Sequence, residues 1–539
     1  MRIRIAFVLA LLLVVAAPVG AEEAPEPMDV SEGRQVGPAA ATNSLNGIYV
    51  SPYDGNVYVA SVGGDEITVH DPNTGDLLDR IGPERGVHGP DDVFITDDGT
   101  VYWTEILRGY VGMLKPGHDP VHQFVGPGVN PITMSDDGRL FVGRLFLGEG
   151  LYELDPNLVD DPQLLNENLN VNSFDFGRDG HLYAPSFFTG EILKIDVDSA
   201  VPVTSEVVAN VFGVASAAKF NSKGELFAVN IGEGLVMKVD FSGANNHEVV
   251  LDTVGTIDNI AFGTDDRLFA AVGADNQIVR VGPRGNSKAI TPAGLGLPGG
   301  VAVSPNGTVW VSELFAMRGF TNTKRWTSSF YDRFAPPGTA FAGSMTVSAD
   351  GDDLILSSGF ANSVQVMDPA TGAVSLDVRT LAAPTNAVRH GDIIAAAQAG
   401  AGNVVNAEDS SEVLIGGLGL PLGLASDGNT LYVGDWAFGN IWAVSDAGTS
   451  LVAEGLVLPE GLAIDGDRLL VVEPILKQVT AIDLATGVAS PAIVGLDYSG
   501  RDPEGFFPFG LMSGIAVNDQ SIYVADDGVN KLYQFHRIR

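Results

Sequence analysis

Residues 90–105, PDDVFITDDGTVYWTE, contain the features that decide the fold. A proline and two acids precede an alternating apolar run, which is followed by an Asp-Gly pair, a second alternating run and a glutamate. Alternation with a period of two is typical of a β-strand with one buried face, and Asp-Gly is a preferred pair in tight hairpin turns. The stretch therefore predicts two antiparallel strands joined by a short turn.

The same unit recurs along the chain. Close copies begin at Pro298, Pro421 and Pro459, and looser copies bring the number of units to twelve. Most units continue with two further strands. A unit of four antiparallel strands that recurs about every forty residues is typical of a β-propeller blade. One ring of twelve blades would leave an unusually wide hole. We therefore expect an all-β protein of twelve four-stranded blades, forming two tandem six-bladed β-propellers over residues 45–297 and 298–539.

The twelfth unit ends before its blade is complete. After NKLYQFH the chain has no room for a full fourth strand, whereas GRQVG at residues 33–37 precedes the first unit as an unassigned strand. We expect GRQVG to pair as an outer strand that closes the sixth blade. SKAIT at residues 287–291, or a neighbouring segment, would then close the twelfth blade.

The first residues have the pattern of a secretory signal peptide. Two arginines precede an apolar stretch at residues 6–17, and small residues lead to a cleavage site after Ala21. Residues 22–44 follow as an acidic, proline-rich leader. No later run of about 18 apolar residues is present, as a membrane-spanning helix would require. We expect a secreted or periplasmic protein without membrane insertion.

The composition excludes several classes of site and partner. The absence of cysteine excludes disulfides, thiolate metal ligands and a catalytic thiol. The chain has 30 basic and 67 acidic residues, which give a net charge of −37. Phosphate backbones and anionic membranes would repel such a surface, so we expect no nucleic-acid partner. Many of the acids fall in turns and indicate a solvated acidic surface.

One position of the repeat distinguishes the two halves of the chain. The second residue of each unit falls where the innermost strand begins, at the rim of the central channel. This position is polar in every unit of the first half and mostly small or apolar in the second half. Its occupants are Asn46, Asp91, Asn130, Asn172, Ser216 and Asp258 in the first six units, and Gly299, Gly343, Thr385, Leu422, Glu460 and Ser513 in the last six.

Converging carboxylate and amide oxygens suit a hard divalent cation such as Ca²⁺, which takes six to eight oxygen ligands. We therefore expect a cation site in the first ring, formed by the polar rim residues. The second ring offers only Glu460 as a charged rim residue, and we expect no equivalent site there. Alternatively, the rim Asn and Asp side chains only hydrogen-bond the backbone of their own loops. The proposed ligands are Asn46, Asp91, Asn130, Asn172 and Asp258.

The repeats resemble those of NHL-repeat proteins and of the gluconolactonase/regucalcin family of six-bladed propellers, over nearly all of residues 45–539. The resemblance implies a catalytic divalent metal held by a Glu, an Asn and an Asp of the rim. Asp91, Asn172 and Asp258 match these ligands best by motif position. The chain departs from the family pattern, because Asn46 stands where the family has its glutamate and Ser216 where it has its aspartate.

Further candidates lie near the same rim. His88, three residues before Asp91, is a candidate general base, although a loop histidine is more often a surface residue. Glu105 ends its second strand and is a candidate for substrate binding or, alternatively, for capping its loop. Asp175 and Lys219 share one repeat position in consecutive blades and form either a substrate-orienting pair or an inter-blade ion pair.

These observations leave three functions open. The first is an exported, metal-dependent lactone or ester hydrolase of gluconolactonase type, in which Asp258 or His88 takes a proton. The second is a non-catalytic propeller that binds a small molecule, or a protein partner through the second ring. The third is a lyase acting on a cyclic ester. Propeller repeats specify the architecture but not the chemistry, so these alternatives are decided by the site.

Overall fold

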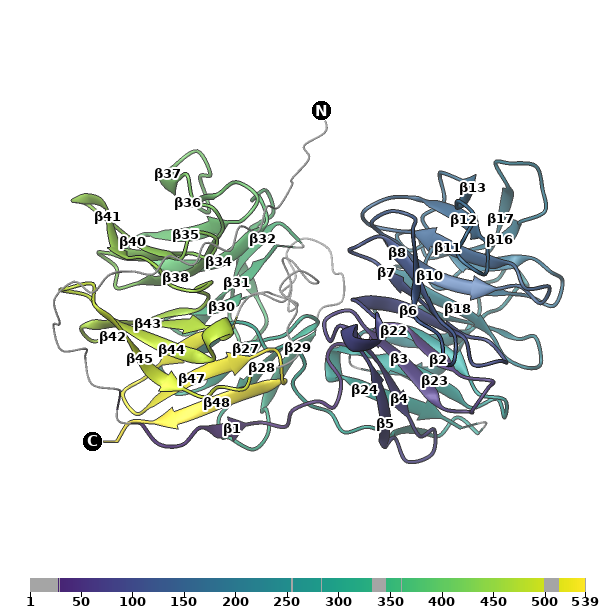
Figure 1. The fold of residues 1–539 in the computed structure, drawn as a ribbon, viewed down its shortest axis with the longest axis horizontal. Helices are drawn as coiled ribbons and strands as arrows, with labels where there is room; N and C mark the ends of the chain where they lie inside the picture. Colours follow the sequence, from purple (N-terminus) through teal and green to yellow (C-terminus); the bar gives the residue numbers. More distant parts are fainter. Residues whose placement is uncertain are drawn as a thin grey trace.

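The computed structural model describes residues 28, 30–253, 255–282, 284–331, 346–359, 361–498 and 513–538. The protein is all-β, with twelve four-stranded antiparallel sheets in the described part (Figure 1). Three short 3-10 helices, η1 (Pro83–Arg85), η2 (Gly273–Asp275) and η3 (Pro474–Leu476), lie in loops. None of the helices described is long and apolar enough to cross a membrane.

The first six sheets correspond to the first six units of the sequence. Listed from the innermost strand outward, they are β2 (Ile48–Val50), β3 (Val57–Ser61), β4 (Glu66–His70), β5 (Leu77–Ile81); β6 (Pro90–Ile95), β7 (Val101–Glu105), β8 (Tyr110–Leu114), β9 (Val121–Phe124); β10 (Val129–Met134), β11 (Leu140–Arg144), β12 (Gly150–Leu154), β13 (Gln163–Asn166); β14 (Asp175–Phe176), β15 (Leu182–Pro185), β16 (Glu191–Asp196), β17 (Thr204–Asn210); β18 (Ala215–Phe220), β19 (Leu226–Asn230), β20 (Leu235–Lys238), β21 (Glu248–Asp252); and β22 (Ile257–Phe262), β23 (Leu268–Val272), β24 (Gln277–Val281), β25 (Ser287–Ala289).

The other six sheets contain the remaining strands. They are β26 (Val301–Val303), β27 (Val309–Ser312), β28 (Ala316–Phe320), β29 (Ser328–Tyr331); β30 (Thr346–Asp350), β31 (Asp353–Ser358), β32 (Ser363–Met367), β33 (Val374–Val378); β34 (Pro384–His390), β35 (Ile393–Gln398), β36 (Asn403–Asn406), β37 (Val413–Gly416); β38 (Pro421–Ser426), β39 (Leu431–Asp435), β40 (Asn440–Ser445), β41 (Gly448–Ala453); β42 (Leu462–Asp465), β43 (Arg468–Glu473), β44 (Gln478–Asp483), β45 (Ala489–Val494); and β46 (Ile515–Val517), β47 (Ser521–Asp526), β48 (Lys531–His536), β1 (Arg34–Val36).

The innermost strands make each group of six sheets a closed ring. In the first ring β2, β6, β10, β14, β18 and β22 contact one another in this order, and β22 contacts β2 again. In the second ring β26, β30, β34, β38, β42 and β46 form the same closed series. The sheets are therefore the blades of two six-bladed propellers, numbered 1–6 and 7–12 below. The boundary expected after residue 297 falls between β25 and β26.

The closing strands are exchanged relative to the sequence-based prediction. GRQVG does pair as an outer strand, but β1 lies antiparallel to β48 and closes the twelfth blade, not the sixth (Figure 1). The sixth blade is closed by β25, which pairs with β24. The physical reason is local: β25 follows β24 after a short turn, whereas β48 has an unpaired edge that needs a strand from elsewhere.

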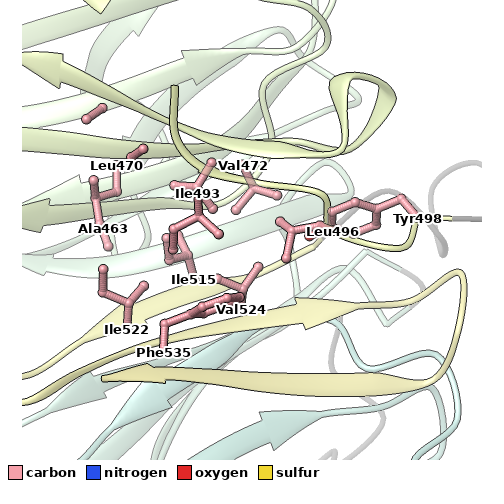
Figure 2. Packing of buried hydrophobic residues seen from close by; sticks show 13 residues of the cluster. Ala463, Leu470, Val472, Ile493, Leu496, Tyr498, Ile515, Ile522, Val524 and Phe535 are labelled. Atoms are coloured by element: carbon pink, nitrogen blue, oxygen red, sulfur yellow. The ribbon is translucent and has the colours of Figure 1, made fainter. Parts of the chain in front are cut away.

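Apolar layers between adjacent blades form the core. Between blades 11 and 12, Leu470 and Val472 of β43 face Ile515, Ile522 and Val524 of the last blade (Figure 2). These side chains alternate along their strands with residues on the other face of the blade, which packs on the next neighbour. Each blade thus contributes to two apolar layers, and the layers continue around each ring.

A buried arginine connects the two rings. Arg318 of β28 is fully buried, and its guanidinium donates hydrogen bonds to Glu313 in its own blade (2.8 Å) and to Asp275 of the first ring (2.9 Å). It also donates to the carbonyl oxygen of Ala274 and stacks over Trp326, 4.5 Å from the ring centroid. The junction therefore joins blade 6 to blade 7 through a paired, hydrogen-bonded charge.

Closure by β1 leads to a stability prediction. Val36 is buried in an apolar cluster with Phe320 and Leu532, whereas Gln35 is exposed. Val36→Asp places an unpaired charge in this cluster and is expected to lower the free energy of unfolding of the second ring by about 3 kcal/mol or more. Calorimetric unfolding measures the effect, and Gln35→Asp is the matched control. Equal effects of both variants would contradict the assignment of β1 as a structural strand.

Candidate functional site

Four of the six polar rim residues of the first ring lie at β-bulges: Asp91, Asn130, Ser216 and Asp258. The pairing of β6 with β7 shifts between Pro90 and Val93, so that Asp91 and Asp92 both stand within the irregularity. The pairing of β22 with β23 shifts in the same way around Asp258. A bulge inserts a residue and redirects side chains at the end of a strand. The repeat therefore presents its polar residues where the six inner strands converge.

Asp91 and Asp258 are the two acids among the rim residues predicted from the sequence. Asp91 is buried and Asp258 is mostly buried, and neither carboxyl accepts a hydrogen bond from any described residue. Burial raises the pKa of Asp258 to about 7, and the charge of Asp92 contributes. Burial, then the charges of Asp258 and Asp92, raise the pKa of Asp91 well above its usual value. The two carboxyls are thus close enough to influence each other.

Asp92 was missed by the sequence analysis, although it is the most connected acid of the channel. One carboxyl oxygen accepts a hydrogen bond from the amide of Asn259 (3.1 Å). The other accepts from the hydroxyl of Ser173 (3.3 Å) and from the backbone N–H of Ile132 (3.4 Å). Its carboxyl therefore contacts blades 3, 4 and 6 from blade 2. The doubled acid in PDD was the signal for a second polar layer behind the rim.

Two of the three rim asparagines accept hydrogen bonds from backbone N–H groups through their side-chain oxygens. Asn46 accepts a hydrogen bond from the N–H of Val62 (3.2 Å), and Asn172 accepts one from the N–H of Ser173 (2.8 Å). The side chain of Asn130 has no hydrogen-bond partner among the described residues. Two of the three amide oxygens therefore keep a single lone pair, and each amide retains its N–H donors.

Asp175 and Lys219 cross-link blades 4 and 5 through the backbone. The ammonium of Lys219 donates to the carbonyl oxygen of Phe174 (2.9 Å), and Asp175 accepts from the N–H of Phe220 (2.9 Å). Within the described residues no direct ion pair joins the two side chains. Burial raises the pKa of Asp175, and the charge of Lys219 opposes this shift. Burial also raises the pKa of Asp92, and the charge of Lys219 opposes this shift, so the two groups lie near each other.

His88 and Glu105 point toward partners other than the two rim acids. The Nδ1 atom of His88 lies 3.8 Å from a carboxylate oxygen of Asp65 in blade 1. Glu105 accepts a hydrogen bond from the indole N–H of Trp103 (3.1 Å) and lies 3.3 Å from His122. Burial alone would lower the pKa of His122, but the hydrogen bond to Glu105 outweighs it and raises the pKa. The structure thus gives Glu105 partners within its own blade.

The donors around the first channel fit a divalent cation only in part. The two rim carboxyls are free of hydrogen bonds, which suits cation ligands. However, the described residues contain no group of three or more His, Asp or Glu side chains arranged to hold a metal ion. A cation between Asp91 and Asp258 would therefore need amide or water oxygens to complete its coordination.

The mouth of the second ring has a different chemistry. Glu460 is buried and accepts a hydrogen bond from the backbone N–H of Ser513 (2.8 Å), while Leu422 is fully buried. Gly343 lies outside the described residues. Asp526, at the end of β47, is also buried. Burial and the charge of Asp527 raise the pKa of Asp526 to about 8.

Comparison with known proteins gives structural neighbours only. No protein-family model matches the chain, and no curated protein matches it. Virginiamycin B lyase from Staphylococcus aureus is 15% identical with a TM-score of 0.38, and covers 52% of this chain and 96% of its own. A gluconolactonase from Xanthomonas campestris is 15% identical with a TM-score of 0.37, and covers 48% and 96%. Each neighbour thus matches about half of this chain, and the propeller assignment rests on the twelve sheets themselves.

The raised pKa of Asp258 predicts the pH dependence of stability. The folded protein keeps a proton that the unfolded chain releases between about pH 4 and pH 7, so the free energy of unfolding falls as the pH rises through this window. In the presence of a chelator, Asp258→Asn is expected to raise the free energy of unfolding at pH 8 by about 1–4 kcal/mol and to remove much of the slope.

Denaturant unfolding at pH 4 and at pH 8 measures this effect. Asp97→Asn, at the exposed turn between β6 and β7 of blade 2, is the control and should change neither the stability nor its slope. A destabilised Asp258→Asn protein at pH 8 would show that the carboxylate is stabilised by a partner in the folded protein.

Proposed function

We propose that the protein hydrolyses a small lactone or a related ester at the mouth of the first channel. The observation that supports this proposal is the pair formed by Asp91 and Asp258. Asp91 is buried and Asp258 is half-buried at the rim, and both carboxyls lack hydrogen-bond partners among the described residues and have raised pKa values. Groups of this kind are costly for folding and are more frequent at functional sites than elsewhere.

Asp258 is suited to the role of general base. With a pKa of about 7, its carboxylate is substantially populated at neutral pH and basic enough to take a proton from water. The water oxygen then forms a bond to the acyl carbon, and the ring C–O bond of the lactone breaks. The leaving oxygen takes the proton back from Asp258, which restores the carboxylate and gives a hydroxy acid as the product. The free amide N–H groups of Asn46 and Asn172 can hydrogen-bond the carbonyl oxygen as it becomes negative.

A divalent cation, Ca²⁺ by the sequence argument, is part of the proposal. Asp91 and Asp258 would hold it, with the free lone pairs of the rim amides Asn46, Asn130 and Asn172. When bound, such an ion would polarise an ester carbonyl and offset the repulsion between the two carboxylates. His88 is an alternative proton acceptor, because Asp65 lies beside its imidazole.

Hydrolysis is tested with a panel of lactones and aryl esters. We expect turnover whose pH profile rises through about pH 7 in the cation-free protein and at lower pH with Ca²⁺, because a bound cation lowers the pKa of Asp258. Asp258→Asn and Asp91→Asn should each lower kcat/KM by a factor of about 100 or more. Glu460→Gln, at the same repeat position in the second ring, should retain the activity. A product with a new double bond would indicate a lyase, and equal loss in all three variants would contradict a site in the first ring.

Cation binding is tested separately by calorimetric titration of the chelated protein with Ca²⁺. We expect one bound ion per chain, a higher melting temperature with Ca²⁺ and weaker binding in Asp91→Asn and Asp258→Asn. The reason is that each variant removes one of the two charged ligands. Glu460→Gln is again the control. Two ions per chain, or unchanged binding in the rim variants, would contradict the proposed site.

Ligand binding without turnover is the second candidate function. It is favoured by the rim amides, because Asn46 and Asn172 use their oxygens on the backbone and keep N–H donors suited to an oxygen-rich ligand. A protein partner bound through the second ring belongs to the same candidate. Binding of a lactone that the protein does not consume would support it over hydrolysis.

Export is the remaining part of the proposal. It rests on the N-terminal pattern in the sequence, which lies outside the described residues. N-terminal sequencing of protein recovered from the cell envelope or medium should find cleavage after Ala21. An intact N-terminus in the cytoplasmic fraction would contradict export.

A further inference from the structure

An exposed group of apolar side chains lies on the loops of blades 3 to 5. Phe146 is 39% exposed, Leu147 55%, Phe188 62% and Phe212 59%. Phe187 lies beneath them, with its ring centroid 5.0 Å from that of Phe146 and 5.1 Å from that of Phe188. We call the four exposed residues, Phe146, Leu147, Phe188 and Phe212, the apolar wall.

The wall is on the same face of the ring as the polar rim. Its loops join the second and third strands of blades 3 and 4 and precede the first strand of blade 5. Backbone hydrogen bonds connect them to the entry segments of the inner strands. Leu145 donates to the carbonyl oxygen of Gly128 (2.7 Å), and Ala215 donates to that of Phe187 (3.0 Å). The wall therefore borders the mouth where Asn130 and Ser216 begin their strands.

The order of the blades places the wall across the mouth from the two acids. Asp91 belongs to blade 2 and Asp258 to blade 6, whereas the wall occupies blades 3 to 5. On the side of blades 1 and 6 the equivalent loops are covered. A Cβ on Gly63 would meet the side chain of Leu297, and a Cβ on Gly273 would meet that of Phe315 in the second ring. The wall thus lies on the side of the mouth away from these two contacts.

A buried cluster supports the apolar wall, and two residues of the wall have unfavourable backbone conformations. Phe187 packs with Leu145 and Ile231 in a buried cluster, which limits the movement of the exposed rings. Phe146 and Phe212 have φ angles of 65° and 55°, in the left-handed region that bulky residues rarely adopt. Such conformations are unfavourable and cluster at ligand-binding sites. The two aromatic residues that adopt them, Phe146 and Phe212, stay 39% and 59% exposed.

We propose that the apolar wall binds the alkyl or aryl group of the substrate, whose ester carbonyl lies toward Asp91 and Asp258. This inference rests on the proposed function and specifies its substrate class as an amphiphilic lactone or ester. A small molecule with one polar and one apolar end is complementary to a mouth that has acids on one side and exposed aromatic rings on the other. Burying two or three aromatic faces against an alkyl chain supplies binding energy that a short lactone cannot obtain.

The test compares γ-dodecalactone, which carries an eight-carbon chain, with γ-butyrolactone, which carries none. The ratio of kcat/KM for the long over the short lactone is expected to be high in the natural protein. In Phe188→Ser this ratio should fall by roughly tenfold, mainly through KM for the long lactone. Phe124→Ser is the matched control, because Phe124 is similarly exposed (56%) but lies on the outer strand β9. An unchanged ratio in Phe188→Ser would overturn the proposal.

A binding measurement tests the apolar wall independently of the proposed hydrolysis. Calorimetric titration of Asp258→Asn with γ-dodecalactone should detect binding that weakens by roughly tenfold when Phe188→Ser is added. If the natural protein hydrolyses no lactone but this binding is found, hydrolysis fails and the wall stands as a ligand site. If lactones are hydrolysed without preference for chain length, the wall fails and hydrolysis stands. Self-association that Phe188→Ser abolishes, with no effect on the lactone, would also overturn the proposal.

Discussion

The convergence of six inner strands at one end of each ring is the constraint on which the structure depends. At this end neighbouring blades are joined through the backbone: Gly47 donates to the carbonyl oxygen of Asp91 (2.7 Å), and Gly514 donates to that of Gly299 (3.0 Å). A Cβ on Gly47 would lie 2.6 Å from the Cα of Asp92, so no larger residue fits there. The glycines and bulges of the entry segments allow the approach, and the side chains beside them become enclosed at the mouth.

Burial of the rim side chains has different effects in the two rings, because the same repeat position holds different residues. In the first ring it removes water from Asp91, Asp92 and Asp258, and the resulting cost appears as raised pKa values. Hydrogen bonds from three other blades stabilise the carboxylate of Asp92 and offset part of the cost of its burial. In the second ring Leu422 occupies the position without such cost, and Glu460 is hydrogen-bonded to its neighbour. The two rings thus share an architecture while differing in the chemistry of their channels.

The architecture could be predicted from the sequence because it depends on local signals. Period-two alternation and Asp-Gly turns are properties of neighbouring residues. They are sufficient to locate β6 and β7 of blade 2 from the sequence. The pairing of GRQVG could not be settled in this way, because two blades were candidates and only the unpaired edge of β48 decides between them. The rim acids Asp91 and Asp258 were found by counting one position per repeat. That rule missed Asp92 and Asn259, because a bulge presents two successive residues to the channel.

The apolar wall was not predictable for a related reason. Phe146, Phe188 and Phe212 are far apart in the sequence and stand in loops that do not follow the repeat. Only ring closure brings these loops to one side of the mouth, away from Leu297 and Phe315, which approach blades 1 and 6. The hydrogen bonds of Asp175 and Lys219 to the backbone could not be predicted from the sequence either. A charged side chain at this position can pair with another side chain or with the backbone, and only the structure shows which.

The pairing of β1 with β48 also fixes an order of events during biosynthesis. The strand at residues 34–36 leaves the ribosome nearly 500 residues before its partner at residues 531–536. The first ring has all its strands once residue 289 has been made, so it can fold while synthesis continues. The second ring stays open until the last strand arrives, and its early strand must wait unpaired across nearly 500 residues. Contacts of such sequence separation form slowly, so the exposed edge of β48 is the point at which a chaperone or a neighbouring chain can compete with correct closure.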